Sequence, residues 1–339
     1  MKIVFSTTWN PHFLTITEYV ERAGGRLGQK FVGFDDSRFL IPGRLRDRVP
    51  VLARLDLAYL NRRLALKVER TRPDVLLSAG GERIHPATVE AARRAGATTV
   101  LWTIDPLKPE DPRLALAPHF DFVFCGGTEM MQALQAAPLR RPAVWLPFGC
   151  DPELHRPVSL SPEEQRTYGH DVAFVGSLHA HMYPNRIEML EALADRDLGV
   201  WGPGAHAIPP GSPIAAHVRG EGTGYELWTR IYSASKIVLC AHYAGPGPRS
   251  RQASPRVYEA LACGAFLLCD DRPDVTALFG DGCELAVFGD RDELRDKARH
   301  YLSHEKQRER IAQQGRRAVL AQHTYTHRLQ RMLDVIGRG

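Results

Sequence analysis

Short apolar segments alternate with helical runs along the chain, and this alternation limits the possible folds more than any other feature. Each segment spans four or five mostly apolar residues, as expected of a strand buried on both faces in a parallel sheet. With helical runs between them, such as Pro86–Ala95 and Asn185–Ala194, they predict a doubly wound α/β fold. The predicted strands are Lys2–Phe5, Asp74–Leu77, Thr98–Trp102, Phe122–Cys125, Ala143–Leu146, Asp171–Val175, Leu198–Trp201, Ile237–Cys240 and Ala265–Cys269.

The chain has 339 residues, which exceeds one ordinary hydrophobic core and predicts two domains of ~100–200 residues each. The segment WLPFGCDPELHRP, residues 145–157, is rich in proline and follows the fifth predicted strand. A polar stretch then precedes the next strand, at Asp171. We therefore predict one Rossmann-like domain over residues 1–155 and a second from residue 156, with a cleft between the carboxyl ends of their strands.

The composition excludes several classes of protein. Apolar residues make up 44% and charged residues 24%, which is typical of a globular chain, and no apolar run approaches the ~20 residues of a transmembrane helix. The six cysteines are scattered without CxxC pairs, so we expect small apolar side chains in a reducing cytoplasm and no metal site. The net charge of +5 suits an anionic ligand or membrane face, but no motif predicts nucleic-acid binding.

The stretch SPRVYEALACG contains the most informative helix. Ser254 is a good N-cap, Pro255 suits the first helical position and Gly264 suits the residue after the helix, so we predict a helix from Pro255 to Cys263. The N–H groups and partial positive charge at its start, from Ser254 to Val257, favour a bound diphosphate.

Two side chains of this helix point to the same ligand. Arg256 and Glu259 are three residues apart and share a face. Arg256 can bind a diphosphate, and Glu259 lies ~7–8 Å from the helix start, which is the reach from a diphosphate to the ribose of the same nucleotide. Because a carboxylate can accept hydrogen bonds from a ribose diol, the helix predicts a nucleotide-diphosphate site. An ordinary surface ion pair would produce the same pattern.

Further residues could complete the donor site. Gly176 and Ser177 follow a strand, where glycine permits close backbone approach to a phosphate and serine can donate to it. Arg186 could neutralise the charge that develops on a departing diphosphate, a role it would share with Arg256. In the loop WGPG, Gly202 could hold the base through backbone contacts. Each also has a plain interpretation as an ordinary turn or a surface arginine.

The amino-terminal half offers candidates for acceptor activation. His12 follows the first strand, and imidazole has a pKa suited to removing a proton from a hydroxyl. Asp105 in WTIDP could act as a base or hold the acceptor, although Asp-Pro is also a common turn. Glu82 and His85 in SAGGERIHP could line the same cleft. Residues 41–70 are basic and amphipathic, which fits an anionic acceptor, a peripheral membrane contact or a solvated helix face.

Three segments resemble the carboxyl half of group-1 glycosyltransferases, in particular the CgeB-like branch of spore-maturation proteins. They are SPRVYEALACGAFLLCDD with the sequence that follows it, LPFGCDPELHRP, and DVAFVGSLHAHMYPNR. The likeness covers roughly residues 145–330, whereas the amino half shares only VLWTIDP and FDFVFCGG. The resemblance implies a GT-B fold, with the donor held mainly by residues 156–320, the acceptor held by the first domain, and a terminal helix over residues 321–339 that packs back on the first domain.

Under this resemblance, Glu259 matches the ribose-binding glutamate of the family. An earlier glutamate of the family contacts the donor sugar, and Arg251 stands in its place, so the sugar and the stereochemistry stay open. The surrounding segment, residues 242–255, is a candidate lid over the donor phosphates.

The resulting prediction is a cytoplasmic, metal-independent glycosyltransferase. It would take a nucleotide-diphosphate sugar as donor, use no further cofactor, and transfer the sugar to a hydroxyl acceptor that is a carbohydrate, a protein or a small molecule. A nucleotide-sugar epimerase of the same fold and a degenerate, non-catalytic nucleotide-sugar-binding protein stay open as alternatives.

Overall fold

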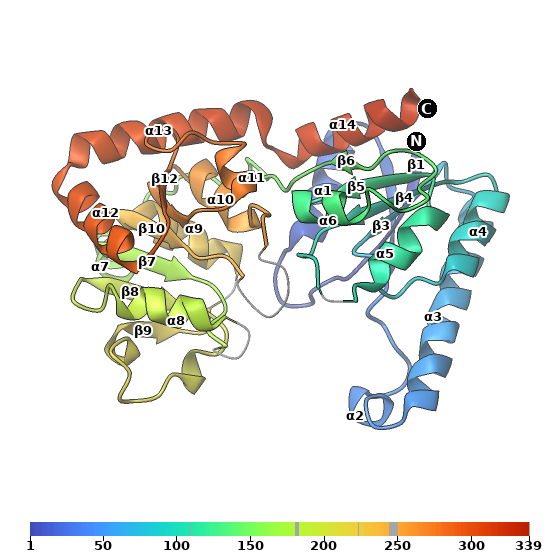
Figure 1. Ribbon diagram of the computed structural model, residues 1–339, viewed down its shortest axis with the longest axis horizontal. Helices are drawn as coiled ribbons and strands as arrows, with labels where there is room; N and C mark the ends of the chain where they lie inside the picture. The colour runs from blue at the N-terminus through green and yellow to red at the C-terminus, as the bar shows by residue number, and fades with distance from the viewer. Residues whose placement is uncertain (109, 180–182, 223, 244–249, 339) are drawn as a thin grey trace. The chain divides into compact units, whose positions relative to one another are not determined.

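The structure, a computed structural model, describes the whole chain except residues 109, 180–182, 223, 244–249 and 339. Contacts within the chain divide it into two units (Figure 1). Unit 1 comprises Met1–Pro147 and Arg328–Gly339, and unit 2 comprises Phe148–His327. Each unit contains one six-stranded parallel sheet, as the alternation of apolar and helical segments predicts.

In unit 1 the strand order is β2-β1-β3-β4-β5-β6. The chain moves to one edge with β2 and then returns to the other side of β1, so the order reverses between β1 and β3. In doubly wound sheets, such a switch point opens a crevice at the carboxyl ends of the strands. The strands are β1 (Lys2–Thr7), β2 (Lys30–Asp35), β3 (Val75–Ala79), β4 (Thr98–Thr103), β5 (Phe122–Cys125) and β6 (Val144–Trp145).

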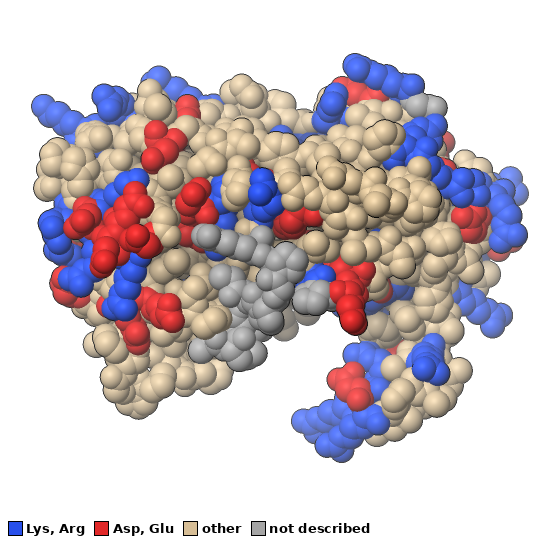
Figure 2. Space-filling view, viewed as in Figure 1, with Lys and Arg blue, Asp and Glu red and all other residues tan. Residues whose placement is uncertain are grey.

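Helices cover this sheet and bury a core that includes Val4, Leu76 and Leu101. One region differs, because α2 and the first turns of α3 extend beyond the sheet, and lysine and arginine gather over them (Figures 1 and 2). The helices of unit 1 are α1 (Ile16–Arg26), α2 (Gly43–Arg46), α3 (Pro50–Thr71), α4 (Pro86–Arg94), α5 (Pro112–Leu116), η1 (Ala117–His119) and α6 (Thr128–Ala133).

In unit 2 the order is β12-β11-β10-β7-β8-β9, with the switch point between β7 and β10. The strands are β7 (Val172–Val175), β8 (Leu198–Trp201), β9 (Val218–Gly220), β10 (Ile237–Cys240), β11 (Leu267–Asp270) and β12 (Ala286–Phe288). The helices are α7 (Pro162–Tyr168), α8 (Pro184–Glu191), η2 (Ala205–Ala207), η3 (Ala215–His217), α9 (Tyr225–Ala234), α10 (Pro255–Ala262), α11 (Pro273–Thr276), α12 (Arg291–Ser303) and α13 (Glu305–Gln322).

All nine predicted strands are present, with ends that differ from the prediction by at most two residues. The sequence analysis missed β2, β9 and β12, which lie at or next to the edges of the sheets. Strand β2 starts at a lysine, contains a glycine and is only partly buried, and β9 and β12 have three residues each. Their apolar runs are therefore too short or too mixed to stand out.

The terminal segment forms two helices, α13 and α14 (Tyr325–Gly337), separated at His323 and Thr324. The division between the units falls within α14, because residues from Arg328 onward belong to unit 1. In the part of the chain that the structure describes, no helix combines the length and apolar character needed to cross a membrane.

Helix α13 packs against α10, and Gly315 permits the close approach. A methyl group at Gly315 would clash with the backbone carbonyl of Glu284 and would lie 2.7 Å from Leu261 Cδ2. By contrast, a methyl group at Gly25, which is exposed in α1, would have no atom within 4 Å.

We predict that Gly315→Ala lowers the free energy of unfolding by about 1–3 kcal/mol, because backbone atoms must move to admit the methyl group. The control Gly25→Ala should raise it by about 0.5–1 kcal/mol through helix propensity. Chemical denaturation followed by circular dichroism measures both. Equal effects of the two substitutions would contradict the close packing of α13.

Candidate active site

The candidate donor site lies at the switch point of unit 2. Strands β7 and β10 are neighbours in the sheet, and Gly176 and Ser177 follow β7 directly. The connection after β10 leads through His242 to α10, which starts at Pro255. The carboxyl ends of two central strands and the amino end of α10 therefore meet at the place where doubly wound sheets bind nucleotides. Residues 244–249 of the predicted lid lie outside the described residues.

Helix α10 has the predicted start and nearly the predicted end. Ser254 is the N-cap and Pro255 the first residue, whereas the last helical residue is Ala262, one before the predicted Cys263. Gly264 has the left-handed φ of +75° that favours glycine after a helix. The Ser254 hydroxyl makes no capping hydrogen bond, and its Oγ instead lies 3.6 Å from Cys240 Sγ.

Glu259 is buried, with 6% of its surface exposed. No hydrogen bond or ion pair to its carboxylate occurs among the described residues, so the interpretation of Arg256 and Glu259 as an ordinary surface ion pair is wrong. Burial raises the pKa of Glu259 to about 7, and the positive charge of Arg256 opposes the shift. A buried carboxylate with unused acceptor capacity is costly for the fold and well suited to a donor such as a ribose diol.

Two arginines meet beside this carboxylate. Arg186 is buried, and its guanidinium donates to the carbonyl oxygens of Ala241 (2.9 Å) and Ser177 (3.0 Å). Burial, and then the charge of Arg256, lower the pKa of Arg186 to about 10, so both stay charged at neutral pH. Among the described residues, neither guanidinium has a carboxylate at ion-pair distance.

The two arginines also share an aromatic neighbour. The guanidinium carbons of Arg186 and Arg256 lie 5.9 and 5.7 Å from the ring centroid of Phe174. Arg186 lies closer still to Tyr183, at 3.7 Å. Cation–π contacts orient the guanidinium groups without neutralising them. Two neighbouring cations, one buried and one half-buried, that have no counter-anion among the described residues define a site for a strongly anionic ligand.

The glycines have roles that differ in part from the prediction. A Cβ at Gly176 would lie 2.8 Å from Arg256 Nη2, so this glycine makes room for the arginine. Gly202 has φ +148°, and a Cβ there would clash with the carbonyl of Gly176. The two glycines thus bring the loops after β7 and β8 together and admit Arg256.

Two other residues that the sequence analysis predicts for the donor site have structural roles. Val257 is fully buried, and its N–H donates to Ser254 O (3.0 Å), so its side chain belongs to the core. Ser177 is partly buried and supports Arg186 through its carbonyl.

A buried polar network below α10 escaped the sequence analysis. The Asp270 carboxylate accepts hydrogen bonds from His242 N (3.0 Å), His242 Nδ1 (2.6 Å) and Arg272 Nε (2.9 Å). His242 Nε2 in turn accepts from the N–H of Ser254 (2.9 Å). These contacts, with His242 first, lower the pKa of Asp270 to about 2, although burial opposes them. The network ties the ends of β10 and β11 to the start of α10.

The cysteines agree in the main with the expected role of small apolar side chains. Five of the six are buried, and Cys283 is exposed. The ligand atoms of Cys240, His242 and Cys269 lie within 4.8 Å of one another, close enough to hold a metal ion. Spacing in the sequence could not reveal this group, because it comes from the ends of two neighbouring strands. Both ring nitrogens of His242 are engaged, with Asp270 and with Ser254, so a metal would have to displace one of these bonds.

In unit 1, a cavity of about 310 Å³ lies at the switch point between β1 and β3. Asp105 and Glu82 line it, as the sequence analysis proposes for the acceptor site, whereas His12 is exposed and outside its lining. Desolvation by the surrounding chain raises the pKa of Asp105, and the positive charge of Arg113 opposes the shift. The residue itself is exposed at the cavity.

The same cavity contains an acidic residue that the sequence analysis missed. Asp36 is buried and accepts hydrogen bonds from Thr8 Oγ1 (3.1 Å) and Arg83 Nη1 (3.0 Å). Burial raises its pKa, and Arg83 opposes the shift. Asp36 follows β2, so the failure to predict that strand concealed the residue. The signal available was the pair Asp35-Asp36 after the apolar run FVGF.

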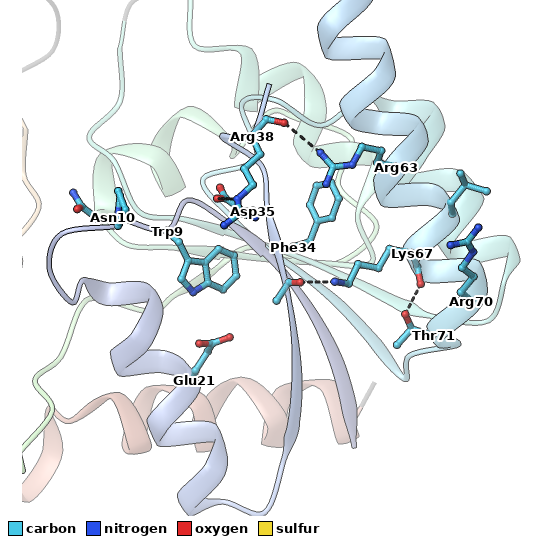
Figure 3. Close-up of a pocket in the computed structure, with 13 residues that line it drawn as sticks. Trp9, Asn10, Glu21, Phe34, Asp35, Arg38, Arg63, Lys67, Arg70 and Thr71 are labelled. Atoms are coloured by element: carbon cyan, nitrogen blue, oxygen red, sulfur yellow. Dashed lines mark hydrogen bonds and ion pairs between the residues drawn. The ribbon is translucent and has the colours of Figure 1, made fainter. Parts of the chain in front are cut away.

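A larger cavity of about 860 Å³ lies between α1, β2 and α3 (Figure 3). Four cationic side chains line it, and two of them are engaged by backbone carbonyls: Lys67 Nζ donates to Gly33 O (2.7 Å) and Arg63 donates to Arg38 O (3.3 Å). This cavity lies at the edge strand β2, and Asn10 lines both it and the smaller cavity. The cationic residues are Arg38, Arg63, Lys67 and Arg70.

Comparisons with known proteins agree with this architecture. Residues 186–334 match the family model described as glycosyl transferase-like. No curated protein matches the chain.

Solved structures are similar over nearly the whole chain. HepE from Anabaena, in complex with UDP-glucose, shares 14% identity, with 100% of each chain covered and a TM-score of 0.71. Sucrose-phosphate synthase from Thermosynechococcus elongatus shares 12% identity over 99% of this chain and 98% of its own, with a TM-score of 0.72. A glycosyltransferase from Rickettsia africae shares 12% over 98% and 97%, with a TM-score of 0.69. At these identities the likeness shows the fold, which is GT-B.

We predict that Glu259 makes stability depend on pH. Its pKa is about 7 in the folded protein and 4.5 ordinarily, so the folded state holds the proton more tightly than the unfolded chain. Ionisation therefore destabilises the fold as the pH rises from about 4.5 to about 7, by an amount on the order of 3 kcal/mol. Glu259→Gln should gain stability relative to the natural protein between pH 5 and pH 8 in denaturant titrations. Parallel pH profiles for the two proteins would contradict this.

Proposed function

We propose that the protein is a glycosyltransferase that moves a sugar from a nucleotide-diphosphate donor to a hydroxyl acceptor. One observation carries the proposal: the buried Arg186 and the half-buried Arg256 are neighbouring cations without a carboxylate partner among the described residues, beside the amino end of α10. A diphosphate supplies the missing negative charge. Glu259, on the same helix, supplies the acceptor for the ribose hydroxyls of that nucleotide.

The proposed chemistry follows from where charge develops. When the bond from the sugar to the diphosphate breaks, the leaving phosphate gains negative charge. Arg186, Arg256 and the partial charge of the α10 amino end stabilise that charge more strongly in the transition state than in the bound donor. The transfer then needs no metal ion, because the guanidinium groups perform the electrostatic role that a metal would have.

The acceptor is proposed to bind in the cavity of about 310 Å³ in unit 1. Asp105 is the base that we favour there, because it lines the cavity and no hydrogen bond to its carboxylate occurs among the described residues. Asp36 is instead engaged by Thr8 and Arg83. It therefore holds Arg83 toward acceptor hydroxyls, and Asp105 removes the proton from the attacking one.

The similar structures guide the choice of donor. Because HepE binds UDP-glucose, we propose a UDP-hexose as the first donor class to test and a hexosyl group as the one transferred. Membership of the CgeB-like branch stays a prediction from the three motifs, since the family match and the similar structures support only the broader class.

A test with ligand fragments separates the roles of the two α10 side chains. We expect Glu259→Gln to weaken binding of UDP and uridine at least tenfold and to leave pyrophosphate unchanged, because only the ribose contact is altered. Arg256→Gln should weaken UDP and pyrophosphate at least tenfold and leave uridine unchanged. Isothermal titration calorimetry measures each affinity.

The matched control is Arg299→Gln, which changes an exposed arginine of α12 in the same unit. It should bind all three ligands as the natural protein does. If Glu259→Gln and Arg256→Gln also bind UDP unchanged, the proposed donor site is wrong.

A second prediction concerns the base. Asp105→Asn should lower kcat by about 10²–10⁴-fold, because it removes the proton acceptor, while the donor Kd stays unchanged. His12→Ala should have little effect, since His12 lies outside the cavity lining. Steady-state kinetics with the donor that calorimetry identifies gives both values. The reverse result would make His12 the base.

The same assays distinguish the alternatives. An epimerase would convert the donor to an isomer without any acceptor, which chromatography of the products detects. A non-catalytic binding protein would show the calorimetric pattern above and release neither free nucleotide nor isomer.

A further inference from the structure

An exposed apolar surface surrounds α2 and the first half of α3. Of the large apolar side chains that the structure describes as exposed, all but Met1 lie between residues 40 and 66. Between residues 50 and 59, α3 buries only one side chain, that of Asp56. In this half of the helix, only the partly buried Leu57 packs against the core of unit 1. The exposed residues are Leu40, Leu45, Val49, Val51, Leu55, Tyr59 and Leu66.

Three of these side chains form a stripe along α3. On α3, Val51, Leu55 and Tyr59 are four residues apart and thus share one face. Leu66 continues near that face and lines the cavity of about 860 Å³. Contiguous apolar surface of this extent is unusual on a protein face that stays in water.

The surface is also strongly cationic. Residues 38–70 contain nine arginine and lysine residues against three acidic residues, a net charge of +6, whereas the whole chain carries +5. The rest of the chain is therefore slightly acidic. Arg44, Arg48 and Arg54 are exposed beside the apolar side chains, and Figure 2 shows cations gathered over this part of unit 1.

The surface has a defined conformation. The buried Asp56 carboxylate accepts hydrogen bonds from the backbone N–H groups of Leu40 (2.9 Å) and Ile41 (3.2 Å). Arg46 stacks on Phe39, with its guanidinium carbon 4.0 Å from the ring centroid. These contacts hold the segment before α2 against α3, so the apolar and cationic side chains are presented together.

We propose that this surface docks on an anionic membrane. Apolar side chains that enter the headgroup region, flanked by arginines that bind lipid phosphates, are the combination that holds amphipathic helices at a bilayer surface. An acidic protein would satisfy the arginines and would not need so many exposed aliphatic side chains among them. The inference is independent of the proposed sugar transfer.

The test is co-sedimentation of the full chain with vesicles of phosphatidylcholine alone or mixed with phosphatidylglycerol. The protein should sediment with the mixed vesicles and not with the neutral ones, and high salt should release it. Arg48→Glu/Arg54→Glu should weaken binding at least tenfold, through the lost attraction of both arginines. Val51→Ser/Leu55→Ser should also weaken binding at least tenfold, through lost apolar insertion.

The control is Arg310→Glu/Arg317→Glu, which reverses two exposed arginines on α13 with the same change in net charge. It should bind vesicles as the natural protein does, and circular dichroism should show that all three variants are folded. The proposal is overturned if the mixed vesicles do not bind at low salt, or if the control loses as much affinity as the arginine variant. It is also overturned if light scattering shows a dimer that Val51→Ser/Leu55→Ser dissociates, because the surface would then bind a second copy.

Discussion

The buried Asp270 carboxylate organises the candidate donor site. It accepts hydrogen bonds from the backbone and the ring of His242 and from Arg272. The Nε2 atom of the same His242 ring accepts a hydrogen bond from the N–H of Ser254. Four donors on one carboxylate are enough to compensate its burial. The consequence is that the end of β10, the end of β11 and the start of α10 cannot move independently. The amino end of α10 is thereby held at the switch point of the sheet, where a diphosphate can approach it.

The charged side chains near this network suit the binding of a ligand better than they suit the stability of the fold. Arg186 and Arg256 repel each other, and Glu259 is a carboxylate with a raised pKa and no hydrogen bond among the described residues. A fold selected only for stability would pair these groups or replace them with apolar side chains. Perturbed ionisable groups gathered at a switch point are instead typical of sites where binding supplies the missing partners. The proposed diphosphate would compensate the positive charges of Arg186 and Arg256, and the proposed ribose would donate hydrogen bonds to the Glu259 carboxylate.

The sequence analysis succeeded where a property depends on residues close together in the chain. The start of α10 at Pro255 and the glycine after it follow from local capping rules, and the buried strands follow from their apolar runs. It failed for Asp36, because the edge strand β2 is only half-buried and has no clear apolar pattern. It also failed for the group of Cys240, His242 and Cys269, since the register of two strands brings them together.

Local patterning in the sequence by itself determined the α/β class, most of the strands and the position of Glu259 along a helix that begins with an N-cap and a proline. Only the tertiary structure decided that Glu259 is buried with no hydrogen bond to its carboxylate among the described residues, that Arg186 and Arg256 are neighbours, and that the first half of α3 exposes Val51, Leu55 and Tyr59. The physical reason is that helix caps and apolar periodicity act over a few residues. Burial and charge pairing instead depend on segments that are distant in the chain and meet only when the sheet has formed.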